Sequence, residues 1–158
     1  MRIFLTGATG FIGYHLVPLM KHHQLLLVGQ HEENFSGVTN LKFIKNDLKN
    51  FDRWKEEVEE FSPEACIHLA WSGLPNYSLS RCTENFDISI QLLGFLTHIG
   101  CKRIFVAGTC WEYGGIQGQA SENAQPEAPS LFASFKTAIR LIGKQLTRSK
   151  DINFIWGR

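Results

Sequence analysis

The eight residues TGATGFIG, from Thr6 to Gly13, constrain the fold of this chain more than any other stretch. They follow the apolar run RIFLTG (2–7), which predicts a buried strand, and they lead into FIGYHLVPLMKHH (11–23), which predicts a helix. Between a strand and a helix, glycines permit a tight turn, close approach of the backbone to a pyrophosphate, and close helix packing. The stretch therefore predicts a dinucleotide-binding turn at Gly7, Gly10 and Gly13, with a flexible glycine turn as the alternative.

The rest of the chain alternates between apolar runs and helical patterns. Alternation of this kind indicates parallel strands with helices on both faces, an α/β fold with a Rossmann-like doubly wound parallel sheet. We expect one domain over residues 1–158. In the predicted first helix, the apolar set expected on one face is Phe11, Ile12, Leu16, Leu19 and Met20. Further strands are predicted at 24–29, 41–47, 64–71, 102–109 and 152–158, helices at 51–61, 82–100 and 130–149, and a surface loop at 113–129.

Charge and cysteine content exclude several classes of partner. A net charge of +1 gives no electrostatic footprint for nucleic acid or for a membrane surface. The four cysteines show no CxxC pairing, so we expect reduced thiols, no metal site and a cytoplasmic protein. The apolar run at 25–28 is too short to cross a bilayer, and the amino end lacks the pattern of a signal peptide.

Four later segments, in order, are similar to motifs of one family: KNDLKN (45–50), IHLAW (67–71), ENF (84–86) and VAGTCWEYG (106–114). With the G-x-x-G-x-x-G spacing of the turn, they resemble the extended short-chain dehydrogenases/reductases, NAD(P)-dependent nucleotide-sugar epimerases and dehydratases. The resemblance runs from Met1 to Arg158. It implies a structural asparagine at Asn85, a catalytic hydroxyl at Thr109, and a cofactor cleft lined by Gly7, Thr9, Gly10, Phe11, Ile12, Gly13, Asp47, Leu48, His68, Leu69, Ala70, Trp71, Asn85 and Lys136.

Three of these residues have simpler alternatives. His68, at a strand end, fits a packed and hydrogen-bonded residue without a chemical role. Asp47 fits a cap for the helix that follows it as well as a contact to adenine. Cys110, beside Thr109, has no evident partner base and is expected to be inert.

A catalytic tyrosine is missing from the expected place. The family carries a tyrosine and a lysine four residues apart, and here that pair is Phe132 and Lys136. By resemblance, Lys136 holds the nicotinamide ribose and lowers the tyrosine pKa, and the tyrosine hydroxyl exchanges a proton with the substrate. Three explanations stay open: a wrong register, a different proton carrier (Tyr113, Glu112 or a water bound by Thr109), or a chain that has lost catalysis.

The choice of cofactor turns on the end of the second strand. An acidic residue there binds the ribose 2′-hydroxyl of NAD, but this chain has Gly29, followed by Gln30 and His31. The pattern favours NADP(H) over NAD(H), unless the strand runs longer and Glu32 binds the ribose.

The resemblance also bears on substrate and assembly. Family members continue into a carboxy-terminal region that grips the nucleotide-sugar, so we expect this chain to be truncated before that region. It further implies a homodimer through the helices at 82–99 and 131–148. The function expected is hydride transfer between the nicotinamide and a nucleotide-sugar, by an epimerase, a dehydratase or a 4-ketoreductase. The alternative is a non-catalytic dinucleotide-binding or regulatory module.

Overall fold

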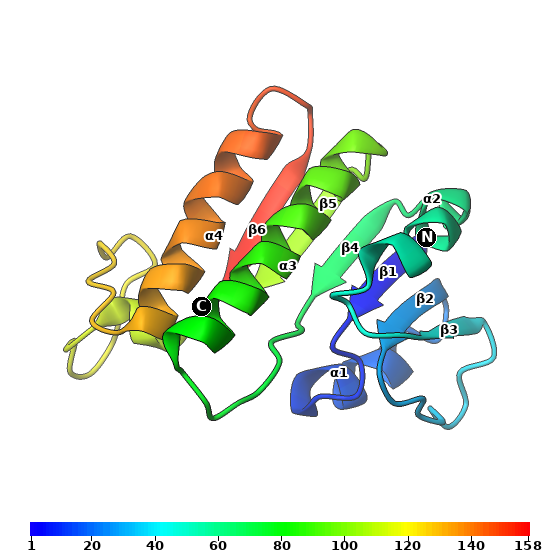
Figure 1. Ribbon diagram of the computed structural model, residues 1–158, viewed down its shortest axis with the longest axis horizontal. Coiled ribbons are helices and arrows are strands. Elements are labelled where there is room, and N and C mark those ends of the chain that lie inside the picture. Colours follow the sequence, from blue (N-terminus) through cyan, green and yellow to red (C-terminus); the bar gives the residue numbers. More distant parts are fainter.

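The structure is a computed structural model that describes residues 1–158 throughout. Six strands form one parallel sheet in the order β3-β2-β1-β4-β5-β6 (Figure 1). The predicted α/β class and the Rossmann-like doubly wound sheet are therefore confirmed. The strands are β1 (Arg2–Thr6), β2 (Gln24–Gly29), β3 (Leu41–Lys45), β4 (Ala65–His68), β5 (Arg103–Ala107) and β6 (Asn153–Gly157).

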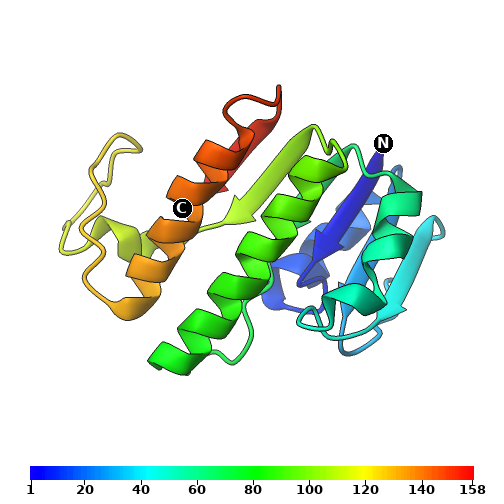
Figure 2. The same ribbon diagram turned by 45° about the horizontal axis from the view of Figure 1, so that its top comes forward.

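Helices cover both faces of the sheet. Connections between parallel strands are right-handed, so the face that a helix covers depends on the direction in which the chain moves across the sheet. The step from β1 to β2 runs opposite to the steps β3–β4, β4–β5 and β5–β6, and its helix accordingly lies on the other face (Figures 1 and 2). The helices are α1 (Phe11–Leu16), α2 (Lys55–Phe61), α3 (Leu79–His98) and α4 (Leu131–Thr147), with 3₁₀ turns η1 (Val17–Met20), η2 (Phe51–Arg53) and η3 (Cys110–Tyr113).

Each face of the sheet has its own apolar core. The larger core packs α2, α3 and α4 against the sheet through residues such as Trp54, Leu93 and Ile139. The smaller core packs α1 and η1 against the opposite face through residues such as Val17 and Met20. β1 and β2 are buried on both faces, which explains why their sequences are almost continuously apolar.

The first helix differs from the prediction. The α-helix ends at Leu16 and continues as η1, with Pro18 in its first turn. Phe11 and Leu19, expected to face the core, are 84% and 78% exposed. The inward face is set by Gly13, which packs against the backbone of the preceding turn, and Val17 follows it on that face. Because glycine has no apolar side chain, the sequence pattern does not mark Gly13 as facing the core. The pattern therefore assigned Phe11 and Leu19 to the core, and this prediction was wrong.

The predicted helix at 51–61 is also divided, because Trp54 leaves helical geometry with φ −136° between η2 and α2. Its indole is buried in the larger core and packs edge-on against Phe51 and Phe95. Among all helices, none combines the length and the apolar character needed to cross a bilayer.

Candidate functional site

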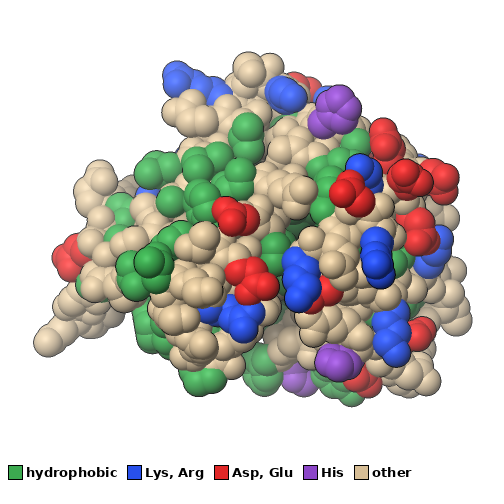
Figure 3. Space-filling view, viewed as in Figure 1, with side chains coloured by type: hydrophobic (Ala, Val, Ile, Leu, Met, Phe, Trp, Pro, Cys, Tyr) green, Lys and Arg blue, Asp and Glu red, His purple; other side chains and the backbone are tan.

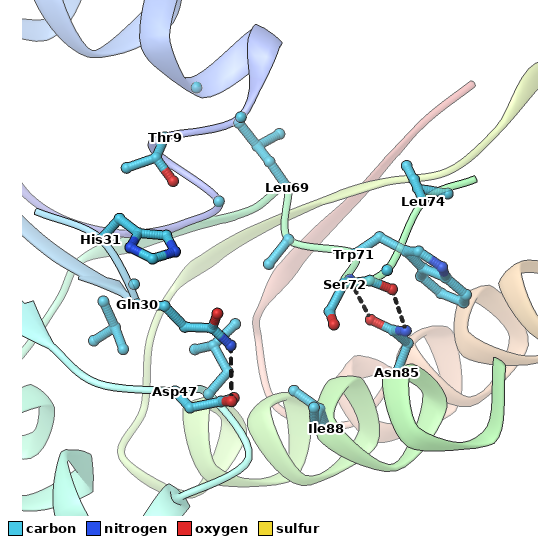
Figure 4. Close-up of a pocket in the computed structure, with 18 of the residues that line it drawn as sticks. Thr9, Gln30, His31, Asp47, Leu69, Trp71, Ser72, Leu74, Asn85 and Ile88 are labelled. Atoms are coloured by element: carbon cyan, nitrogen blue, oxygen red, sulfur yellow. Dashed lines mark hydrogen bonds between the residues drawn. The ribbon is translucent and has the colours of Figure 1, made fainter. Parts of the chain in front are cut away.

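A cavity of about 510 Å³ opens at the carboxyl ends of the central strands. It lies where the chain reverses its direction across the sheet, between β1 and β4, which is where open α/β sheets bind ligands. Its lining comes from the turn after β1, from the ends of β2, β3 and β4, and from α3 (Figure 4). The volume falls within the range of about 300–1,000 Å³ that is typical of ligand pockets.

The glycine turn after β1 forms one wall. Gly7 has φ +78°, and a Cβ placed there would lie 2.7 Å from the backbone nitrogen of Ala70. A Cβ on Gly13 would lie 2.2 Å from the carbonyl oxygen of Gly7, so α1 packs directly on the turn. No side chain caps the first turn of α1, which leaves N–H groups available to an anion. The turn is packed by backbone on both sides, so the alternative of a flexible turn does not hold.

Asp47 forms part of the opposite wall. It does not cap a helix, since Asn50 and Trp54 are the N-cap residues of η2 and α2. Its carboxylate accepts hydrogen bonds from the side chain of Gln30 (2.7 Å) and from the backbone N–H of Lys49 (3.0 Å). The capping alternative is therefore wrong, and this carboxylate lies in the cavity (Figure 4).

Asn85 ties α3 to the segment that follows β4. Its side-chain oxygen accepts from the backbone N–H of Ser72 (2.7 Å), and its amide donates to the carbonyls of Ser72 (3.0 Å) and Arg81 (2.8 Å). These bonds fix the end of the cavity that Trp71 and Leu74 line (Figure 4).

His68 lies behind the cavity wall and does not line it. It is buried, with Nδ1 2.6 Å from Thr6 Oγ1 and Nε2 3.0 Å from Ser89 Oγ. Because the Ser89 hydroxyl donates to the carbonyl of Asn85, it accepts from Nε2–H, and the ring is neutral. Burial, assisted by the charge of Lys136, lowers the pKa of His68 to about 3. The packed, hydrogen-bonded alternative holds.

Thr109 and Lys136 lie near the carboxyl end of β5. Thr109 is the N-cap of η3, where its hydroxyl accepts from the N–H of Trp111 (3.3 Å). The Lys136 ammonium, from α4, donates to the carbonyl of Ala107 (2.7 Å) and is buried. Burial lowers the pKa of Lys136 to about 8, against an opposing pull from the charge of Glu112.

Phe132 stands one helical turn before Lys136 inside a cluster of aromatic rings. Its ring centroid lies 5.0 Å from that of Trp71, 5.1 Å from Tyr77 and 5.6 Å from Trp111. Sequence reasoning missed Tyr77 and Trp111 as neighbours of this position. Tyr77 belongs to a loop without any motif, so only the folded chain brings it to Phe132.

Glu112 and Tyr113, two proposed substitutes for the missing hydroxyl, have other contacts. Glu112 is fully buried, and its Oε1 accepts from the N–H of Thr109 (3.2 Å) and from Nε1 of Trp156 (2.9 Å). Arg140 Nε lies 3.7 Å from its other oxygen. The guanidinium of Arg158 lies 4.4 Å from the ring centroid of Tyr113. Glu112 thus has a structural role in which both hydrogen bonds go to one carboxylate oxygen.

The cavity brings together all of the predicted cofactor-binding residues except Lys136 and His68. Thr109 and Phe132 do not line it either. Prediction did not name the polar residues Asn46, Ser72 and Ser89, which also contribute to the wall. No cluster of three metal-ligating side chains occurs in the structure. The lining residues predicted from sequence are Gly7, Thr9, Gly10, Phe11, Ile12, Gly13, Asp47, Leu48, Leu69, Ala70, Trp71 and Asn85.

Comparison with known sequences gives a family match across almost the whole chain. Residues 3–158 match the family described as "NAD dependent epimerase/dehydratase family". The chain is 29% identical over 143 residues to a dTDP-6-deoxy-L-talose 4-dehydrogenase (NAD(+)) of Aggregatibacter actinomycetemcomitans, covering 89% of this chain and 53% of that protein. It is 27% identical over 157 residues to a UDP-glucuronate 4-epimerase of Thermodesulfobacterium geofontis, covering 87% of this chain and 49% of that protein. The chain spans about half the length of these relatives.

Solved structures agree on the fold. The UDP-glucose 4-epimerase of Thermus thermophilus, in complex with NAD, superimposes with a TM-score of 0.82 at 22% identity, covering 99% of this chain and 54% of that one. The UDP-Glc/GlcNAc 4-epimerase of Campylobacter jejuni superimposes with a TM-score of 0.85 at 16% identity, covering 98% and 52%.

Proposed function

The chain belongs to the NAD dependent epimerase/dehydratase family, and from that premise we propose that residues 1–158 are the NAD(P)-binding domain of an enzyme acting on a nucleotide-sugar. The reaction is hydride transfer, in an epimerase, a dehydratase or a 4-ketoreductase. One observation carries the proposal: a glycine turn without a side-chain cap opens into a cavity at the switch point of a parallel sheet.

The residues of this chain have distinct roles in the proposal. Gly7, Gly10 and Gly13 let the backbone approach a pyrophosphate, and Asp47 faces the adenosine part. The bound nicotinamide supplies the hydride chemistry. Thr109 hydrogen-bonds the reacting oxygen, and Lys136 orients the nicotinamide ribose by resemblance to the family. Phe132 carries no exchangeable proton, so a proton must reach the substrate by another route.

We propose NADP(H) as the preferred cofactor. β2 ends at Gly29, and neither Gly29 nor Gln30 brings a free carboxylate to a ribose 2′-hydroxyl. Glu32, the acidic alternative, is exposed and absent from the cavity wall, whereas His31 lines it. These features support a 2′-phosphate.

A second candidate function is a dinucleotide-binding module without catalysis. Phe132 favours it, because this ring is buried among Trp71, Tyr77 and Trp111. For either function we propose a homodimer through α3 and α4. Hydrophobic side chains gather over these two helices (Figure 3), and Leu79, Leu131 and Leu141 are all at least half exposed.

Calorimetric titration with NAD(H) and NADP(H) tests the shared part of both functions. We expect both dinucleotides to bind, with NADP(H) tighter. A Gly10→Ala variant places a methyl group on the cavity wall, where its only near neighbour is the Gly7 carbonyl oxygen at 3.3 Å. It is expected to keep the fold and to lose affinity by roughly tenfold or more, since the backbone no longer approaches the phosphates.

Gly115→Ala is the matched control, because Gly115 lies outside the cavity and nothing surrounds its Cβ position within 4 Å. Its affinity should equal that of the parent chain. A folded parent chain that binds neither dinucleotide would refute both candidate functions.

A further inference from the structure

Trp71 stands between the cavity and the residues assigned to catalysis. The indole lines the cavity, whereas Thr109, Phe132 and Lys136 do not. Its ring also meets Phe132 edge to face, with centroids 5.0 Å apart and planes at 84°. In Figure 4 the Trp71 side chain extends away from the glycine turn and Asp47, at the far end of the pocket. Trp71 therefore contacts both the cavity and the Phe132 ring, which the cavity does not reach.

The same indole covers the ammonium group of Lys136. Nζ lies 4.4 Å from the centroid of the Trp71 ring, and it donates to the carbonyl of Ala107 at 2.7 Å. A cation over an indole face is attracted to it, most strongly when both are shielded from water, and Lys136 is buried. Lys136 thus has two partners within the protein and is not among the residues that line the cavity.

From these contacts we infer that Trp71 closes the reacting end of the cavity, so that the site binds the adenosine diphosphate part of a dinucleotide and admits the nicotinamide only after the indole turns away. The inference rests on the proposed function, because it concerns the same cavity. Binding and reaction then become separate events, and the second requires the Trp71–Lys136 contact to break.

The indole is held by packing and by Lys136 alone. Its Nε1–H is buried without a hydrogen-bond partner, and a buried donor without an acceptor costs free energy. No hydrogen bond to the indole has to break when Trp71 moves. The backbone after it is fixed by the bonds between Asn85 and Ser72, so movement falls on the side chain.

Paired ligands that differ only in the nicotinamide test this inference. ADP-ribose and NAD form one pair, and 2′-phospho-ADP-ribose and NADP form the other. Titrated into the folded chain, the two members of a pair are expected to bind with dissociation constants within about threefold of each other, because the nicotinamide gains no contact. In Trp71→Ala, the dinucleotide should bind roughly tenfold more tightly than its partner, as expected when a cation–π contact no longer has to be broken.

Trp111→Ala is the matched control. Trp111 packs on the same Phe132 ring but is exposed and does not line the cavity, so its removal should leave the ratio near one. If Trp71→Ala does not fold, Trp71→Phe, which keeps an aromatic ring at the position, replaces it in the test. Its ratio of the two dissociation constants in a ligand pair should lie between those of the parent chain and Trp71→Ala.

A parent chain that binds the dinucleotide more than tenfold tighter than its partner would overturn the inference and leave the proposed function standing. The inference would also be overturned, with the proposed function still standing, if both Trp71 variants fold and show the same ratio of dissociation constants within a ligand pair as the parent chain. A folded chain that binds none of the four ligands would refute the proposed function and the inference with it.

Discussion

His68 is a buried histidine whose ring is neutral in the folded chain at ordinary pH. The Thr6 hydroxyl lies 2.6 Å from Nδ1, the Ser89 hydroxyl accepts from Nε2–H, and burial lowers the pKa of His68 to about 3. In the unfolded chain the same ring binds a proton near its ordinary pKa of about 6.5. The unfolded state therefore binds more protons between these two values, and the folded state loses stability as the pH falls through this window.

Urea unfolding at neutral pH and near pH 4.5 measures the effect. We expect the parent chain to lose about 2–3 kcal/mol more than a His68→Asn variant over this interval, because asparagine does not titrate. The carboxylates titrate in both proteins and cancel in the comparison. Equal losses in the two proteins would show that His68 is not held neutral by its surroundings.

Phe132 differs from the tyrosine of the family by a single atom, the side-chain hydroxyl oxygen. A Phe132→Tyr variant adds a hydroxyl one turn from Lys136, where the family carries its proton donor. We expect the rate of NADPH formation from NADP with a nucleotide-sugar to rise by about 10²-fold, the scale of a positioned acid or base. Absorbance of the reduced nicotinamide measures it.

Phe135→Tyr is the matched control, since Phe135 lies on the same helix but packs against Phe86. It should leave the rate unchanged. If Phe132→Tyr gives the same rate as this control, the missing hydroxyl is not what limits turnover.

Sequence reasoning at this scale succeeded where a motif fixes a residue relative to a strand end. The glycines, Asp47 and the Leu69–Trp71 segment all follow strands directly, and all lie in the cavity. It could not choose between the alternatives for His68 and Asp47, because burial and hydrogen-bond partners come from other elements. The rings around Phe132 belong to two separate connections, β4–α3 (Trp71 and Tyr77) and β5–α4 (Trp111), so no local pattern predicts their contact.

At the scale of elements, the packing of α1 on the β1 turn depends on the absence of a side chain at Gly13. A methyl group there would lie 2.2 Å from the Gly7 carbonyl oxygen and 2.6 Å from Ala8 Cα, both backbone atoms. Gly13→Ala is therefore expected to destabilise the fold by about 1–3 kcal/mol or more, as overpacking does. Urea unfolding measures the change.

Gly94→Ala in α3 is the contrasting substitution. Gly94 is helical and nothing lies within 4 Å of its Cβ position, so alanine should stabilise the chain by up to about 1 kcal/mol. Destabilisation of similar size by both changes would mean that helix packing on the turn is not specific to Gly13.

All six strands were predictable because each is a short run dominated by apolar residues and bounded by turns. The helix boundaries were less predictable from the sequence. α1 gives way to a 3₁₀ turn at Val17, and Trp54 interrupts a predicted helix to reach the core. In both places a tertiary contact, Gly13 on the turn or the indole in the core, overrides the helical pattern.

At the scale of the whole molecule, the hydrophobic surface over α3 and α4 is the proposed dimer interface (Figure 3). Leu141 on α4 is 55% exposed. A charge there would be desolvated in the interface, so Leu141→Asp should shift the mass measured by light scattering from dimer to monomer. Leu19→Asp, on the opposite face of the sheet, should not. A dimer that persists in Leu141→Asp would place the interface elsewhere.

The family and the fold were both accessible from sequence, since the motifs occur in order along nearly the whole matched range, residues 3–158. The closure of the cavity by Trp71 was not. It depends on Trp71 of the β4–α3 connection meeting the Phe132 ring and the Lys136 charge of α4, which only the assembled sheet brings about.

The Glu112 carboxylate has a consequence for how the last strand pairs. Its hydrogen bond from Trp156 joins η3 to β6, and β6 pairs only with β5. Slippage of β6 by one residue would turn Trp156 to the other side of the sheet and remove one of the donors to a buried carboxylate. A shifted register of β6 therefore costs free energy, and the carboxylate that accepts from Thr109 also holds β6 in its register against β5.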